Sequence, residues 1–315
     1  MYIFFVFLAI AVITLLASLW AYFKTFYNDE KFSDMRRLPT SKQYKPYNHI
    51  LEALMDEMDA LDGEIVSISM GKKKELYATY YHVADNAPLH IQFHGYKGNY
   101  LRDFCGGNKL ARNMGHNTLV IQQRAHTKSF GRTISFGIKE RHDCLSWIKY
   151  ANERFGDKTP IILSGVSMGG ATVLMVSEME LPDNVICIIA DCPYSSPKEI
   201  ISREAKRMKY PAKLIMPFLW LGGAIWGGFN LFESDAVRAV KNAKCPILLI
   251  HGEDDRFVPC DMSREIYENS DKSKTRLITF PNAAHGMSYV VNTERYTQEV
   301  ESFVSSALTQ AQKAE

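Results

Sequence analysis

The stretch that decides the fold is Ile161-Ile-Leu-Ser-Gly165-Val-Ser167-Met-Gly169-Gly170, which continues into Ala171-Thr-Val-Leu-Met175. The apolar run before Gly165 predicts a buried strand, and the small-residue segment after it predicts a helix. Gly-x-Ser-x-Gly between a strand and a helix is typical of a sharp turn that holds the serine hydroxyl above the sheet. Larger side chains would clash in so tight a turn, which explains the glycines. Ser167 is therefore the candidate nucleophile.

A serine hydroxyl needs a base to take its proton and an acid to orient that base, in the chain order Ser, Asp or Glu, His for this kind of turn. The strand predicted at Pro246 to His251 ends in Gly252-Glu-Asp-Asp255, a cluster of acids. The next strand, Thr275 to Phe280, ends in a loop that contains His285. Catalytic groups gather at the carboxyl edge of open parallel sheets, so we expect these loops to meet there.

Working outward, strands and helices alternate from residue 64 onward, which predicts a mostly parallel sheet with helices on both faces. The first two strands follow each other without a long helix and are expected to form an antiparallel edge. The predicted strands are Glu64 to Ser69, Leu76 to His82, Leu89 to Phe93, Asn117 to Gln122, Pro160 to Ser164, Val185 to Ala190, Pro246 to His251 and Thr275 to Phe280. The predicted helices include Leu101 to Met114, Ile138 to Glu153, Ala171 to Glu180 and Met262 to Asn269.

Composition limits the class of protein. The 315 residues carry 37 Lys and Arg against 35 Asp and Glu, a net charge of +2, and 46% of them are apolar. These values exclude a disordered chain and a strongly basic nucleic-acid binder. The six cysteines show no Cys-x-x-Cys pair and no zinc-ligand spacing, so we expect free thiols and no metal site. Free thiols favour a reducing compartment.

The first segment stands apart from this globule. From Tyr2 to Phe23 the chain has 22 uncharged residues, which at ~1.5 Å per residue give a helix of about 33 Å, long enough to cross a bilayer. A cleavable signal peptide is the alternative. No Lys or Arg precedes the run, it is long for a signal sequence, and no small-x-small cleavage site follows it. We therefore predict an uncleaved single-pass membrane anchor.

Charges after the span predict its orientation. Lys24, Lys31, Arg36 and Arg37 follow the apolar run, whereas only the α-amino group precedes it. The positive-inside rule then places the body of the chain on the cytoplasmic side. We predict an anchor at residues 1–24, a polar juxtamembrane linker at 25–48 and one folded domain at 49–315.

Four motifs in order make residues Ile50 to Leu308 resemble the α/β-hydrolase superfamily of serine hydrolases, near its bacterial esterase and serine-aminopeptidase-like branch. The motifs are Phe93-His94-Gly95-Tyr96, Gly165-Val-Ser167-Met-Gly169, His251-Gly252-x-x-Asp255-x-x-Val258-Pro259 and Ala284-His285-Gly286.

The resemblance implies an α/β-hydrolase fold in which Ser167 is the nucleophile, Asp255 the acid and His285 the base. It also implies an oxyanion hole made by the backbone N–H groups of Tyr96 and Met168, the arrangement that such a turn requires. The mechanism needs no metal and no organic cofactor.

Several other polar residues receive structural interpretations. His94 and His251 end strands but have the wrong chain order for the base. Asp191 ends a strand at the same edge and is a possible stand-in acid, with bracing of the loop as the favoured role. The segment Gln123 to Gly131 resembles a family loop only in part and is expected to be scaffolding.

A second uncharged run, Leu214 to Phe232, has 19 residues and is rich in aromatic side chains. Its length would allow a second membrane span. A span here would place Ser167 on one side of the membrane and Asp255 and His285 on the other, which argues against this interpretation. The run is better read as part of a cap at about 195–242, inserted between the strands of the nucleophile and of the acid. Its aromatic residues suggest a substrate pocket formed by Phe218, Trp220 and Trp226.

These observations predict a serine hydrolase that cleaves a carboxylic ester at the membrane through an acyl-enzyme. Its partners would be a small ester or acyl substrate and, through the N-terminal helix, the bilayer, with no nucleic acid. A serine peptidase of the aminopeptidase or prolyl-oligopeptidase type, acting on small amides or peptides, is the first alternative. A non-catalytic binding protein with the same fold is the second, since a fold does not establish an activity.

Overall fold

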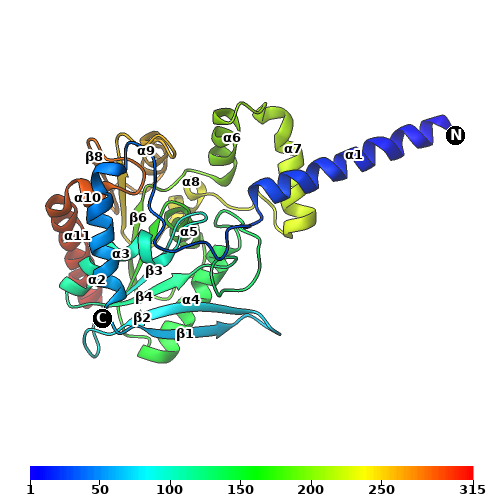
Figure 1. Cartoon of the computed structure of the whole chain (residues 1–315). Coiled ribbons are helices and arrows are strands. Elements are labelled where there is room, and N and C mark those ends of the chain that lie inside the picture. Colours follow the sequence, from blue (N-terminus) through cyan, green and yellow to red (C-terminus); the bar gives the residue numbers. More distant parts are fainter. Residues whose placement is uncertain (315) are drawn as a thin grey trace.

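A central sheet organises the chain in the computed structural model, which describes residues 1–314. Within these residues the sheet has eight strands in the order β1-β2-β4-β3-β5-β6-β7-β8. Figure 1 shows it crossing the body of the molecule. The strands are β1 (Glu64–Ser69), β2 (Glu75–Tyr81), β3 (Leu89–Phe93), β4 (Asn117–Gln122), β5 (Ile161–Val166), β6 (Val185–Asp191), β7 (Ile247–Gly252) and β8 (Thr275–Phe280).

The strand directions match the sequence prediction. β1 pairs antiparallel with β2, and β2 antiparallel with β4, whereas all later neighbours are parallel. The predicted antiparallel edge is therefore confirmed. The parallel strands end at one common edge, which brings the loops after β3, β5, β6, β7 and β8 together.

Helices cover both faces of the sheet, as predicted. The pleat turns alternate residues of β5 to opposite sides. Ile162 faces the cluster of α3 and α11, whereas Leu163 faces the cluster that contains α4 and α5. The helices of the body are α2 (Asn48–Asp59), α3 (Tyr100–Asn113), α4 (Glu140–Phe155), α5 (Met168–Met175), α9 (Cys260–Glu268), α10 (Ser288–Val291) and α11 (Thr293–Ala314).

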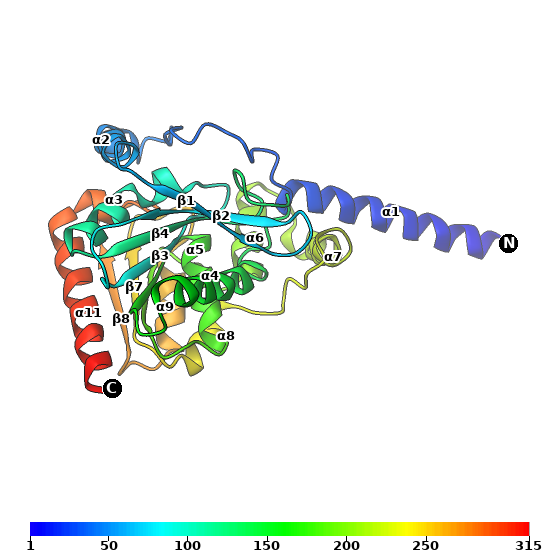
Figure 2. The same ribbon diagram turned by 90° about the horizontal axis from the view of Figure 1, so that it is seen from below.

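An insertion of residues 192–246 separates β6 from β7. It contains α6 (Pro197–Arg207), α7 (Ala212–Gly222), the π-helical turn η3 (Gly223–Gly227) and α8 (Ala236–Ala239). α1 (Tyr2–Thr25) leaves the body as a long helix, and both views show α7 lying across its C-terminal half (Figures 1 and 2). In the described part of the chain α1 is the one helix long and apolar enough to cross a membrane.

The segment after α1 differs from the predicted polar linker. Phe26 is fully buried, and the buried Asn28 donates from Nδ2 to the carbonyl of Ala125 at 2.9 Å. Tyr27 forms an isolated β-bridge with Thr133. The linker thus packs on the body because its apolar and amide side chains find partners there, which its composition did not reveal.

Helix boundaries differ most at the central turn. The helix predicted at Ala171 to Glu180 begins three residues earlier, because Ser167 itself is the N-cap and α5 starts at Met168. α2, α6 and α11 were not predicted. Each is amphipathic, with polar residues on its exposed face.

Candidate active site

The β5–α5 turn holds Ser167 in a strained conformation. Its φ of 57° and ψ of −115° are unusual for a residue with a side chain. A Cβ on Gly165 would lie 2.2 Å from the backbone of Gly169, and a Cβ on Gly169 would lie 1.7 Å from the carbonyl oxygen of Phe93. Only glycine fits either position. The turn therefore presents the hydroxyl of Ser167 at the carboxyl edge of the sheet.

His285 and Asp255 reach Ser167 from the loops after β8 and β7. Nε2 of His285 lies 2.9 Å from Oγ of Ser167, and Nδ1 lies 2.6 Å from Oδ2 of Asp255. The other carboxylate oxygen of Asp255 accepts hydrogen bonds from the backbone N–H groups of Phe257 and Val258. The structure thus brings the three predicted residues into one hydrogen-bonded chain.

Asp255 is held in its charged form. Burial would raise its pKa, but the imidazole of His285 and the hydrogen bond from His251 outweigh burial and bring the pKa to about 2. The charged carboxylate fixes Nδ1 of His285 as the protonated nitrogen and leaves Nε2 free to accept. Nε2 faces Ser167, so the arrangement is able to take a proton from the hydroxyl.

The predicted oxyanion donors belong to the loop after β3 and to the first residue of α5, two segments that adjoin Ser167. A Cβ on Gly95 would lie 3.4 Å from the Cβ of Ser167, so the loop after β3 closely approaches the turn. Asp103 holds that loop by accepting from the N–H of Gly95 at 2.9 Å. Within residues 1–314 the N–H of Tyr96 donates no hydrogen bond. Met168 is the first residue of α5, where a backbone N–H has no partner within the helix.

Asp191, the possible stand-in acid, does not contact His285 through its carboxylate. Its Oδ2 accepts from the hydroxyl of Tyr296 at 3.1 Å, and its backbone carbonyl accepts from the N–H of Ser167 at 2.8 Å. Burial raises the pKa of Asp191 to about 6. These contacts show that Asp191 supports the turn at Ser167, as the favoured interpretation predicts.

The two strand-end histidines also make structural contacts. His94 contacts the carbonyl of Gly95 through Nδ1 and accepts from the N–H of Gln123 through Nε2. Nε2 of His251 lies 2.9 Å from the carbonyl of Val258 and 3.3 Å from Oδ2 of Asp255. His251 therefore supports the acid. Its role was not predicted beyond a structural one.

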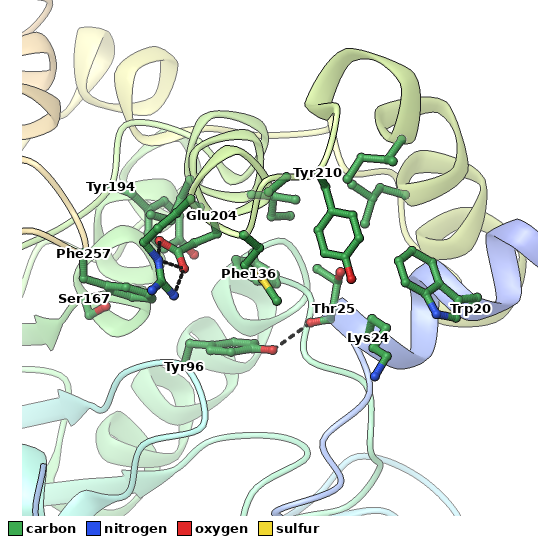
Figure 3. A pocket seen from close by; sticks show the side chains of 17 residues that line it. Trp20, Lys24, Thr25, Tyr96, Phe136, Ser167, Tyr194, Glu204, Tyr210 and Phe257 are labelled. Atoms are coloured by element: carbon green, nitrogen blue, oxygen red, sulfur yellow. Dashed lines mark hydrogen bonds and ion pairs between the residues drawn. The ribbon is translucent and has the colours of Figure 1, made fainter. Parts of the chain in front are cut away.

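An apolar cavity of about 360 Å³ extends from Ser167 toward α1. Figure 3 shows Ser167 at one end and Trp20 of α1 at the other, with Tyr96 and Tyr210 between them. Most of the wall is aliphatic or aromatic, with Glu204 and Arg207 paired to each other at 2.7 Å. Other lining residues are Lys24, Thr25, Phe136, Tyr194, Ile200, Ile201, Ala205, Met208, Ile215, Leu219 and Phe257.

A second cavity, of about 410 Å³, also reaches Ser167. Its walls come from the linker and from the loops after β3 and β8, and they carry charges of both signs. Ser167, Tyr96 and Phe257 line both cavities. The polar wall includes Glu30, Asp34, Arg37, Tyr44, Lys97, Asn99, Arg102, Asp103 and His285.

The predicted substrate pocket of Phe218, Trp220 and Trp226 is wrong. These residues are outside the lining of both cavities at Ser167. Nε1 of Trp220 donates to Asn230, and Nε1 of Trp226 donates to Ser18 of α1. The run from Leu214 to Phe232 carries no charge on any side, so its composition could not show which side faces Ser167. Leu219 and Ile215 are the residues of α7 that do.

Three residues at or near the site were not predicted from the sequence. Trp20 closes the apolar cavity from a helix interpreted only as an anchor. Tyr44 of the linker donates to the carbonyl of His285 at 3.1 Å. Sγ of the buried Cys192 lies 4.0 Å from Nε2 of His285. Among the described residues, Cys192, Asp255 and His285 form the one grouping with metal-ligand geometry, and its acid and imidazole already hydrogen-bond to each other.

A mostly parallel sheet with an inserted segment and a Ser-His-Asp chain at its carboxyl edge defines the class. The protein is a serine hydrolase of the α/β-hydrolase superfamily. More narrowly, the chain belongs to the prolyl oligopeptidase family, whose sequence pattern matches residues 128–311.

The chain is also similar to individual known proteins. The chain is 27% identical over 229 residues to the uncharacterized protein YqkD of Bacillus subtilis, covering 72% of this chain and 74% of YqkD. It is 24% identical over 208 residues to the lysophosphatidylserine lipase ABHD12 of Rattus norvegicus, covering 61% of this chain and 48% of the lipase. The chain therefore spans about half the length of that lipase.

A solved structure supports the fold. The Pyrococcus furiosus esterase Pf2001 superposes with a TM-score of 0.62 at 23% identity. The superposition covers 85% of this chain and 97% of the esterase. At this identity the likeness concerns the fold.

Proposed function

We propose that the chain hydrolyses carboxylic esters that carry an apolar acyl group, through an acyl-enzyme on Ser167. The observation that carries this proposal is the position of Ser167 between an apolar cavity of about 360 Å³ and a polar cavity of about 410 Å³. An ester with an apolar acyl chain and a polar alcohol matches this division. The similarity to a lysophosphatidylserine lipase and to an esterase supports the same reaction class.

In the proposed reaction Oγ of Ser167 attacks the ester carbonyl while Nε2 of His285 takes the hydroxyl proton. The N–H groups of Tyr96 and Met168 stabilise the negative oxygen that forms. His285 gives its proton to the alkoxide as the carbon–oxygen bond breaks, which leaves the acyl group on Ser167. Water then repeats these steps in the second half, and Asp255 stabilises the imidazolium throughout.

A peptidase is the second candidate, because the chain belongs to the prolyl oligopeptidase family. A peptide substrate with a free amine requires a carboxylate near the reacting carbonyl. Glu30, Asp34 and Asp103 line the polar cavity. Asp103 is already paired with Arg102 and with the N–H of Gly95, which leaves Glu30 and Asp34 as the candidates to bind the amine. An amide leaving group would take its proton from His285 in the same way.

We also propose that α1 remains attached as a membrane anchor with the body on the cytoplasmic side. Its last turns form part of the folded body: Ser18, Ala21 and Tyr22 are buried, and the carbonyl of Thr25 accepts from the hydroxyl of Tyr96. A signal peptide that is removed would not be expected to form such contacts. Protease accessibility in sealed membrane vesicles tests the orientation.

The deciding experiment labels the membrane fraction with a fluorophosphonate probe, comparing the native chain with Ser167→Ala. We expect labelling of the native chain and none of the variant, since the probe reacts with an activated serine. A series of p-nitrophenyl esters and aminoacyl anilides then separates the candidates. Faster anilide cleavage would favour the peptidase, and an unlabelled but folded native chain would favour a binding protein.

A further inference from the structure

The outer face of α7 is apolar and lies open. Leu214, Pro217, Leu221 and Ala224 recur at helical spacing on one face, beside Trp220. Leu214 is 70% exposed and Trp220 40% exposed. The opposite face, with Ile215 and Leu219, lines the apolar cavity. A helix that is apolar all round is normally buried in protein or lipid, so the outer face requires an apolar environment.

The level of α7 along α1 indicates what that environment is. The 20 residues from Tyr2 to Ala21 rise about 30 Å, which matches the hydrocarbon thickness of a bilayer. α7 and η3 pack against the end of this stretch: a Cβ on Gly222 would lie 2.7 Å from the carbonyl oxygen of Ser18, and Trp226 donates to the hydroxyl of Ser18. If α1 spans the membrane, α7 lies across it at the border between hydrocarbon and headgroups.

The positions of the tryptophans also indicate a membrane–water interface at α7. Of the four in the chain, Trp147 is buried in the core, whereas Trp20, Trp220 and Trp226 lie on α1, α7 and η3. Each of these three is at least 40% exposed. Tryptophan is enriched at membrane–water interfaces, where its ring is apolar and its N–H is polar.

Positive charge surrounds this apolar face. Residues 203–213, which end α6 and begin α7, hold five basic side chains and one acidic one. All five are exposed. Both views show the β1–β2 hairpin pointing toward the same side as α7 (Figures 1 and 2), and its turn carries three further lysines. The basic residues are Arg203, Lys206, Arg207, Lys209 and Lys213 on the insertion, and Lys72, Lys73 and Lys74 on the hairpin.

We propose that the outer face of α7 and the basic residues around it rest on an anionic lipid bilayer, so that the apolar cavity opens into lipid. Trp20, Lys24 and Tyr210 line the end of that cavity that is far from Ser167 (Figure 3). An acyl chain then passes from the bilayer to Ser167 without crossing water. This uptake step rests on the proposed function, whereas the lipid contact does not.

The first test measures lipid contact without using activity. Leu214 on α7 and Ile225 on η3 are both exposed. Leu214→Cys and Ile225→Cys, labelled with an environment-sensitive fluorophore, are reconstituted as full chains in phosphatidylcholine vesicles with 30% phosphatidylglycerol. Ile65→Cys on β1, where the native side chain is 57% exposed, is the matched control. The unsubstituted chain gives the background from native cysteines. We expect nitroxide-bearing lipids to quench the two insertion sites at least threefold more than residue 65; equal quenching overturns the proposal.

The second test removes charge. Lys206→Gln/Lys209→Gln/Lys213→Gln is compared with Lys158→Gln/Lys241→Gln/Lys244→Gln, which makes the same charge change on exposed lysines outside α6, α7 and the segment that joins them. Anionic lipid should raise native turnover of a bilayer-embedded long-chain ester about tenfold, and only the first triple variant should lose that rise. Hydrolysis of soluble p-nitrophenyl acetate should change less than twofold in both.

The outcomes distinguish a failure of the lipid contact from a failure of the proposed function. Equal loss in both triple variants would overturn the charge-guided contact. If no ester is turned over although the probes at residues 214 and 225 are quenched, the proposed function fails and the lipid contact stands.

Discussion

The two cavities that meet at Ser167 are built from different parts of the chain. The apolar one has walls from α1 and from the insertion between β6 and β7, and the polar one has walls from the linker and from the loops after β3 and β8. Ser167, Tyr96 and Phe257 line both. The catalytic groups thus stand on the sheet, while segments outside the sheet supply the two sides. For the proposed ester hydrolysis, we therefore expect the preference for the acyl group and the preference for the alcohol to change independently.

We call the place where the two cavities meet, with Ser167, His285 and Asp255, the junction. The largest expected effect is there, and it should lower turnover equally for short and long acyl chains. Asp255→Asn removes the charge that keeps Nδ1 of His285 protonated, and such a change costs about 10⁴-fold in kcat in a serine triad. The loss should be the same for acetyl and decanoyl esters, measured as kcat for each. A loss that depends on chain length would mean that Asp255 belongs to one cavity rather than to the junction.

The next effect concerns Asp191, whose carbonyl accepts from the N–H of Ser167, and the way its protonation changes the free energy of unfolding. Burial raises the pKa of Asp191 to about 6, above the value of 3.8 expected when the chain is unfolded. The folded state therefore binds a proton more tightly, and this contribution to stability is present below pH 4 and lost as the pH rises through 6. The shift corresponds to about 3 kcal/mol.

Asp191→Asn mimics the protonated side chain and should remove this pH dependence. The free energy of unfolding by urea, measured at pH 4 and pH 8, should differ between variant and native chain mainly at pH 8, where the variant is the more stable. Hydrolysis of acetyl and decanoyl esters should keep its ratio, because Asp191 lines neither cavity. A stability difference that is constant with pH would contradict the assignment.

Filling the apolar side should change chain-length preference alone. Ala205 is buried and lines that cavity, so Ala205→Phe displaces about three methylenes of an acyl chain at ~0.8 kcal/mol each. The ratio of kcat/KM for decanoyl over acetyl esters should fall roughly 50-fold. Trp220→Ser is the matched control and should leave the ratio in detergent within twofold, because Trp220 lies outside the lining.

The polar side should give the smallest effect, and a uniform one. Oδ2 of Asp103 accepts from the N–H of Gly95, and Oδ1 accepts from Nε of Arg102. Asp103→Asn weakens the bond that positions the loop of Tyr96, which should lower kcat about tenfold for every chain length. Kinetics on the same ester series measure it. A change in chain-length preference would show that the two sides are not separate.

The sequence predicted the residues of the junction, Ser167, Asp255 and His285, better than the residues that line the two cavities. Ser167 follows from a local pattern, and Asp255 and His285 follow from loops at the ends of adjacent parallel strands. The cavity walls depend on how distant segments pack. An apolar run without a polar face carries no sign of its orientation, so nothing distinguished Leu219, which faces Ser167, from Trp220, which does not.

The linker escaped prediction for a related reason. Phe26 and Asn28 are individually ordinary in a polar segment, and their burial is decided by partners about a hundred residues away, such as Ala125. Composition describes what a segment contains and not what it meets. The same limit explains why Tyr44 was not assigned to the site.

The bond from the hydroxyl of Tyr96 to the carbonyl of Thr25, 2.9 Å long, has a practical consequence. Cutting the chain after Thr25 to obtain a water-soluble protein would remove Trp20 and Lys24 from the cavity wall and separate the Tyr96 loop from its tether to the helix. The truncated protein would hold its acyl groups in a cleft open to water. Assays on such a fragment would describe a different catalyst, with its own chain-length preference and its own turnover.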